Sequence, residues 1–197
     1  PDVGRQIYQA AAKHLTPVTL ELGGKSPCFV DENFNENWGI KRLVWGKFTN
    51  AGQTCVAPDY ILVDKKAKQR FVELFIKTTK DFFGENPQQS PDFGRIINEK
   101  HFIRLSQLLE KGNILMGGKT DMKDLFIAPT LIDGVSAEDP IMQGEIFGPI
   151  LPIIEYDKLD DAIKFVTSGN KPLALYIFSE DKMYQERIIN ETSSGNA

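Results

Sequence analysis

The residue best suited to covalent chemistry is Cys55, which lies in a probable loop at residues 50–58. Gly52 lets the backbone turn tightly there, and Pro58 stiffens the chain that follows. A thiol on such a loop can face a cleft and act as a nucleophile, provided that backbone N–H groups or positive charge favour the thiolate. Cysteine is also a common small core residue, and composition alone favours that structural interpretation of Cys55.

A candidate base, Glu21, lies near the end of the apolar stretch 18–22, just before Gly23 and Gly24. We predict that residues 18–22 form a short strand, and ligands of open α/β sheets bind at the carboxyl ends of strands. Partial burial there would make the carboxylate a stronger base near neutral pH. Because side chains alternate between the faces of a strand, a solvent-facing edge position explains Glu21 equally well.

The third candidate is Glu145, at the start of the sequence Glu-Ile-Phe-Gly-Pro at residues 145–149. This segment joins a possible short helix to a strand. A glutamate can accept two hydrogen bonds from a diol such as a ribose. A glutamate at a helix end beside a Gly-Pro turn accounts for the same residues, and physical chemistry alone favours that simpler interpretation.

Other common site patterns do not occur in the sequence. Gly-Lys-Ser at residues 24–26 matches the end of a phosphate-binding P-loop, but Thr19 stands where that pattern requires its first glycine. There is no G-x-G-x-x-G dinucleotide motif. His14 and His101 show no metal-ligand spacing with the cysteines, so we predict no metal site. A Cys–His hydrolytic dyad stays open, although nothing positions one.

The elements that must position these residues alternate between helices and strands. The run 173–178 is continuously apolar, as expected of a buried parallel strand. Alternating strands and helices favour an α/β fold with three αβα layers and a mostly parallel sheet. Helical patterns cover residues 2–14, 38–49, 71–82, 102–109, 159–166 and 181–191, and extended patterns cover 18–22, 60–63, 114–116, 126–132, 150–156 and 173–178.

The composition is that of an ordinary globular protein. The chain has 197 residues, 41% of them hydrophobic and 25% charged, with a net charge of −4. Scattered lysines and the negative charge argue against nucleic acid as a partner and against a membrane-surface role. No apolar run reaches the roughly 20 residues that a membrane helix needs. Two cysteines are no disulfide framework, so we expect a reducing cytoplasm and a structural Cys28, with a single bridge left open.

The two ends of the sequence suggest a longer protein. The chain starts at Pro1 without a methionine or a signal-like segment, and it ends on Ser193-Ser194-Gly195-Asn196-Ala197. We expect both ends to be cuts, so that functions carried by the missing parts are not encoded here.

Taken together, three stretches resemble the aldehyde dehydrogenase superfamily. Residues 21–27 resemble its glutamate signature, residues 52–55 its cysteine signature, and residues 145–149 its cofactor-contact motif, in the same order and spacing. The resemblance covers essentially the whole chain. It is strongest for the class 3 branch, which three further stretches resemble: 56–60, 93–98 and 171–176.

The resemblance implies an oxidoreductase that converts an aldehyde to a carboxylic acid. Cys55 would attack the aldehyde carbonyl to form a thiohemiacetal, and its own backbone N–H would hold part of the oxyanion. Loss of hydride to NAD or NADP would leave a thioester, and Glu21 would activate the water that hydrolyses it. A cysteine esterase without a redox step, and a non-enzymatic assembly module, are the alternatives.

The same resemblance implies cofactor contacts at Glu145, Phe147, Leu22 and Gly23. It also implies that most of the NAD(P) site, an oxyanion-hole asparagine and an oligomer-building segment lie outside residues 1–197. We therefore expect this chain to be a catalytic domain that does not retain its cofactor and is nearly inactive alone. The parent enzyme would be a cytoplasmic homodimer acting on small-molecule aldehydes, aliphatic or aromatic.

Overall fold

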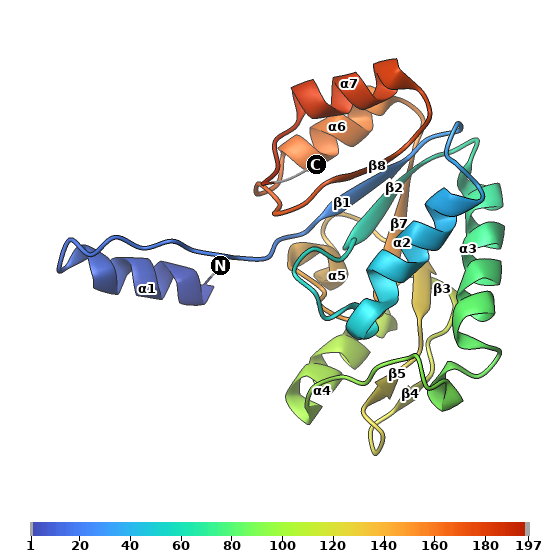
Figure 1. Cartoon of the computed structure of the whole chain (residues 1–197), viewed down its shortest axis with the longest axis horizontal. Helices are drawn as coiled ribbons and strands as arrows, with labels where there is room; N and C mark the ends of the chain where they lie inside the picture. Colours follow the sequence, from blue (N-terminus) through green and yellow to red (C-terminus); the bar gives the residue numbers. More distant parts are fainter. Residues whose placement is uncertain (1, 196–197) are drawn as a thin grey trace.

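The computed structural model describes residues 2–195 of the chain (Figure 1). Its centre is a six-stranded sheet in which every neighbouring pair is parallel except β3 and β6. The prediction of a mostly parallel sheet is therefore confirmed. In sheet order the strands are β3 (Asn113–Met116), β6 (Thr130–Asp133), β7 (Ile150–Tyr156), β2 (Tyr60–Asp64), β1 (Pro27–Val30) and β8 (Tyr176–Phe178).

Helices cover both faces of this sheet, as Figure 1 shows. On one face α2 and α3 pack together through Phe48 and Phe75, whose ring centroids are 5.7 Å apart. On the other face α6 packs on β2, where Tyr60 and Phe165 are 5.8 Å apart. The four helices are α2 (Trp38–Phe48), α3 (Lys68–Phe83), α6 (Leu159–Thr167) and α7 (Lys182–Glu191).

The remaining elements are short or lie at the margins. None of the helices found within residues 2–195 combines the length and the apolar character needed to cross a membrane. The elements are α1 (Asp2–Ala12), η1 (Thr49–Gly52), η2 (Pro87–Gln89), α4 (Glu99–Gln107), η3 (Leu108–Glu110), the antiparallel pair β4 (Thr120–Asp121) and β5 (Phe126–Ile127), and α5 (Pro140–Gln143).

Two strand predictions differ from the structure. The predicted strand at residues 18–22 is wrong, because residues 16–26 form an irregular segment that connects α1 to β1 outside the sheet (Figure 1). An apolar alternating pattern becomes a strand only where a neighbour accepts its backbone hydrogen bonds. The run 173–178 contributes only the edge strand β8, and its three residues are half-buried because one side of β8 has no strand beside it.

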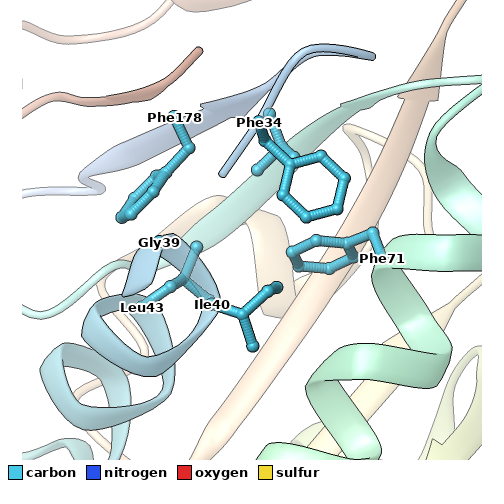
Figure 2. Close-up of a pocket in the computed structure, with 7 residues that line it drawn as sticks. Phe34, Gly39, Ile40, Leu43, Phe71 and Phe178 are labelled. Atoms are coloured by element: carbon cyan, nitrogen blue, oxygen red, sulfur yellow. The ribbon is translucent and has the colours of Figure 1, made fainter. Parts of the chain in front are cut away.

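The carboxyl ends of β1 and β8 are closed by the core (Figure 2). The rings of Phe34 and Phe71 pack edge to face, with their centroids 6.1 Å apart. Together with Phe178 from β8 and Ile40 and Leu43 from α2, they surround a gap too small to admit a water molecule. The gap at the carboxyl ends of β1 and β8 therefore offers no room for a ligand.

Candidate active site

The candidate residues gather at the opposite, amino edge of the sheet. The segment with Glu21 leads into β1, the Cys55 loop leads into β2, and residues 145–149 lead into β7. These three strands are parallel neighbours in the order β7, β2, β1. The expectation that Glu21 follows a strand and marks a carboxyl end is therefore wrong: all three segments come before their strands, and parallel pairing brings them to one edge.

The Cys55 loop begins with an unusual backbone. Asn50, Ala51 and Gly52 all have left-handed conformations, with φ of 53°, 52° and 73°. Such a run costs free energy in residues other than glycine, and strained backbone gathers at functional sites. The side chain of Gln53 fixes the loop by accepting from the N–H of Ile97 at 3.0 Å and donating to the carbonyl of Arg95 at 2.9 Å.

Cys55 itself lies in a turn with its thiol exposed. Cys28 is fully buried in β1, and both cysteines are free, which decides against the single bridge that the sequence left open. The structural role predicted for Cys28 agrees with this position, and burial holds the pKa of its thiol well above the ordinary value. Of the two thiols, Cys55 is therefore the one accessible to a substrate.

The Cys55 loop touches residues 145–149 through backbone alone. A Cβ placed on Gly52 would lie 2.2 Å from the carbonyl oxygen of Gly148. A Cβ on Gly148 would in turn lie 2.5 Å from the side chain of Leu105. The close approach of the two segments therefore depends on the absence of a side chain at Gly52, while the absence of one at Gly148 lets Leu105 pack against that segment.

Glu145 faces the segment that carries Glu21. Its carboxylate lies against Gly23, where a Cβ would be 2.3 Å from Oε1, and it accepts a hydrogen bond from the backbone N–H of Gly24. Partial burial raises the pKa of Glu145, while the Gly24 N–H and the guanidinium of Arg104 act in the opposite direction. The structure thus brings two of the predicted cofactor contacts, Glu145 and Gly23, into direct contact.

The other predicted residues surround this contact. Glu21 is exposed on the irregular segment, so the expected partial burial of its carboxylate is wrong. The side chain of Leu22 is half-buried and turns toward Gly4 of α1. Phe147 is 38% exposed and has a left-handed φ of 54°, which points its ring outward at the cost of backbone strain.

Sequence reasoning missed a set of charged side chains beneath these loops. Lys25 forms a partly buried ion pair with the buried Asp59 at 2.6 Å, and Arg104 donates to the carbonyl of Ile146 at 2.6 Å. Lys25 was considered only as part of a P-loop match. The position of Asp59, four residues after Cys55 and directly before an apolar strand, was the signal that could have revealed it.

Lys47 is the least expected member of this set. It is fully buried on α2, and among the described side chains its Nζ is one of three buried polar atoms without a hydrogen-bond partner. Burial lowers the pKa of Lys47 to about 8, helped by the charge of Lys25 and opposed by Asp59 and Glu145. Lys47 follows Ile40 by two helical turns and so lies on the same apolar face of α2, which was the signal for its burial.

Tyr176 of β8 also contacts the Cys55 loop. Its hydroxyl donates a hydrogen bond to the carbonyl of Val56, the residue after Cys55. Burial raises the pKa of the Tyr176 phenol, with a smaller effect from the two cysteines. Within residues 2–195 no group of three or more His, Cys, Asp or Glu side chains could hold a metal ion.

Comparison with known proteins explains this arrangement. A model described as the aldehyde dehydrogenase family matches residues 1–197. The chain belongs to the aldehyde dehydrogenase family. It is 54% identical over 196 residues to 4,4'-diaponeurosporen-aldehyde dehydrogenase of Staphylococcus aureus (strain NCTC 8325 / PS 47), covering 98% of this chain and 43% of that protein.

Class 3 relatives confirm the predicted branch of the aldehyde dehydrogenase family. The chain is 51% identical to the mouse aldehyde dehydrogenase named dimeric NADP-preferring, over 98% of this chain and 43% of the relative. It is 50% identical to human aldehyde dehydrogenase family 3 member B1, over 99% of this chain and 42% of the relative. The chain thus spans less than half the length of these relatives.

Solved aldehyde dehydrogenases share the fold. A substrate-bound Staphylococcus aureus AldH superposes with a TM-score of 0.97 at 53% identity, over 99% of this chain and 43% of that one. Betaine aldehyde dehydrogenase of the same organism, in complex with NAD+, superposes with a TM-score of 0.87 at 27% identity, over 99% and 41%. The predicted α/β fold of an aldehyde dehydrogenase domain is therefore confirmed.

Proposed function

We propose that this chain is the catalytic domain of an NAD(P)-dependent aldehyde dehydrogenase, with Cys55 as nucleophile and Glu21 as base. The observation that carries the proposal is the meeting of three loops at the amino ends of β1, β2 and β7. One loop exposes the thiol, one exposes a carboxylate, and the third places Glu145 against Gly23 and Gly148 against Gly52. Membership of the family supports the assignment of aldehyde oxidation to this arrangement.

The residues present fit part of a nicotinamide cofactor site. The carboxylate of Glu145 is only half-buried and can still accept hydrogen bonds from ribose hydroxyls. The absence of a side chain at Gly23 lets the Glu145 carboxylate approach the backbone of this segment, and the exposed ring of Phe147 can pack against a flat ring bound beside it. NAD(P), when bound, supplies the hydride acceptor of the reaction.

The side chains of this chain would carry the covalent steps. The thiolate of Cys55 attacks the aldehyde carbon, and the carbonyl oxygen becomes an oxyanion held partly by the Cys55 backbone N–H. After oxidation the carbon is bound to sulfur as a thioester. Glu21 takes a proton from water, the hydroxide attacks the thioester carbon, and the C–S bond breaks to release the carboxylic acid and the Cys55 thiolate.

Several properties of the whole enzyme follow as proposals. Most of the cofactor site, the second half of the oxyanion hole and the oligomerisation segment would lie outside residues 1–197. This chain alone would then retain no NAD(P) and have little activity. The parent enzyme would be a cytoplasmic homodimer that acts on small-molecule aldehydes and binds no nucleic acid. The name of the mouse relative, dimeric and NADP-preferring, supports the dimer and the cofactor.

Substitutions in the full-length protein test the two roles. We expect Cys55→Ala to lower aldehyde-dependent NAD(P) reduction by roughly 10³-fold or more, as loss of a nucleophile does elsewhere. Glu21→Gln should leave a first burst of NAD(P)H and then slow turnover, because the thioester accumulates. Cys28→Ala is the matched control, since that thiol is fully buried in β1 and is not accessible to a substrate.

Three outcomes would contradict the proposal. Unchanged activity in Cys55→Ala would favour a non-enzymatic role for the domain. Ester hydrolysis that depends on Cys55, without aldehyde-dependent reduction of NAD(P), would favour a cysteine esterase. Robust turnover by residues 1–197 alone would show that no further domain is needed.

A further inference from the structure

Asp59 connects all three loops of the candidate site. It lies four residues after Cys55, and its side chain is only 3% exposed. One carboxylate oxygen is 2.6 Å from the Nζ of Lys25, in the segment that carries Glu21. The other accepts the backbone N–H of Ile146 at 2.9 Å, and the N–H of Asp59 donates to the carbonyl of Ser26 at 2.8 Å.

Lys25 extends this connection to the start of the third loop. Besides the carboxylate of Asp59, its Nζ donates to the carbonyl of Ile141 at 2.8 Å and to that of Gly144 at 3.1 Å. These carbonyls belong to the single turn of α5 and the residue after it, where a helix has no intrahelical donors left. A cation at the end of a helix satisfies such carbonyls and is attracted by the helix dipole.

Arg104 completes the attachment from the opposite side. It donates from α4 to the carbonyl of Ile146 at 2.6 Å, while Asp59 holds the N–H of the same residue. Three charged side chains from three separate parts of the chain thus fix the backbone of residues 144–146. Between these fixed points only the side chain of Glu145 is directed toward Gly23.

We infer that Lys25, Asp59 and Arg104 are positioning residues that act through Glu145 in cofactor binding. The inference rests on the proposed function, because it takes Glu145 to contact the cofactor ribose. A buried ion pair is a poor way to gain stability, since its desolvation offsets most of its attraction. What it provides here is a single orientation for a glutamate that directly follows Gly144, a residue whose backbone has wide conformational freedom.

A double-mutant cycle in the full-length protein tests this inference. Asp59→Asn keeps the shape of the side chain but removes the charge that pairs with Lys25. We expect Asp59→Asn and Glu145→Gln each to raise the NAD(P) dissociation constant about tenfold, the effect of losing one charge-assisted hydrogen bond. In the double variant we expect the dissociation constant to be about tenfold above that of the wild type, as in each single variant, because both changes remove the same contact.

A second readout needs neither cofactor nor substrate. Hydrogen exchange at the amide of Ile146 should be at least tenfold faster in Asp59→Asn and unchanged in Glu145→Gln. Asp133→Asn is the matched control. It removes the carboxylate that lies 2.8 Å from the Nζ of Lys68, at the other end of the sheet. If Asp59→Asn does not fold, Arg104→Met tests the same backbone from the carbonyl side.

The outcomes separate the inference from the proposed function. If Glu145→Gln binds NAD(P) like the wild type, the cofactor role of Glu145 is wrong and the inference fails with it. A second outcome is that Glu145→Gln weakens NAD(P) binding and that Asp59→Asn weakens it by the same factor in the wild type and in Glu145→Gln. The proposed function then stands, and positioning through Glu145 is overturned. Exchange at Ile146 that is equally fast in Asp133→Asn would also overturn it.

Discussion

Replacing Lys47 by methionine should stabilise the protein at neutral pH. Lys47 is fully buried and its ammonium has no hydrogen-bond partner, although Asp59 and Glu145 contribute negative charge nearby. Methionine has a similar length and no charge to desolvate. Removing a buried, poorly paired charge in favour of an apolar side chain of similar volume is often neutral or stabilising.

The magnitude follows from the pKa of Lys47. It falls from 10.5 to about 8 in the folded protein, and each pKa unit corresponds to about 1.4 kcal/mol, so the ammonium costs about 3 kcal/mol. Because the folded-state pKa is the lower one, the unfolded chain holds more protons between pH 8 and 10.5. The wild type should therefore gain stability relative to Lys47→Met as the pH rises through this window, while below pH 8 the cost is present in full.

Urea unfolding of both proteins between pH 7 and pH 9.5 measures this difference. We expect Lys47→Met to be more stable by about 3 kcal/mol at pH 7 and by about 1 kcal/mol at pH 9.5. Lys41→Met is the matched control, because Lys41 lies exposed on the same helix and its replacement should give no such pH dependence. A difference that does not change with pH would refute a buried ammonium with a lowered pKa.

Two further predictions concern the contacts of the Cys55 loop. Gly52→Ala should lower the free energy of unfolding by at least about 2 kcal/mol in a denaturant titration. The new Cβ meets the carbonyl of Gly148, and a left-handed alanine alone costs about 1–2 kcal/mol. Gly144→Ala is the control, because a Cβ there meets nothing within 4 Å. Tyr176→Phe should cost about 1 kcal/mol by freeing the carbonyl of Val56. It should also change the rate at which the neighbouring thiol reacts with a thiol reagent, and an unchanged rate would contradict the contact.

The helices were predictable because their signals are local. Phe71 and Phe75 lie one turn apart on the apolar stripe of α3, and Gly84 ends that helix with φ of 76°. The strand predicted at residues 18–22 failed because a strand depends on a neighbour elsewhere in the chain. Local pattern cannot show that residues 16–26 have left the sheet.

The site was predictable only in part for the same reason. Cys55, Glu21 and Glu145 were ambiguous as single residues, and the resemblance to a family singled them out. No local pattern shows that Glu145 lies against Gly23 or that Asp59 reaches Ile146, since these pairs are far apart in sequence. The partial burial expected of Glu21 depended on the strand that does not form.

Because the three loops lead into neighbouring strands at one edge of the sheet, strand pairing sets the distance between the loops. Neighbouring strands lie about 4.8 Å apart, so the first residues of β7, β2 and β1 span about 10 Å across the edge. Main-chain hydrogen bonds set this distance, whatever side chains the loops carry. A slip of one residue in the pairing of Tyr60 with Pro27 would move the thiol by about 3.3 Å. It would also move every side chain of β2 to the opposite face of the sheet. Loop positions without such contacts can therefore vary, whereas the registers of three short strands have to stay fixed.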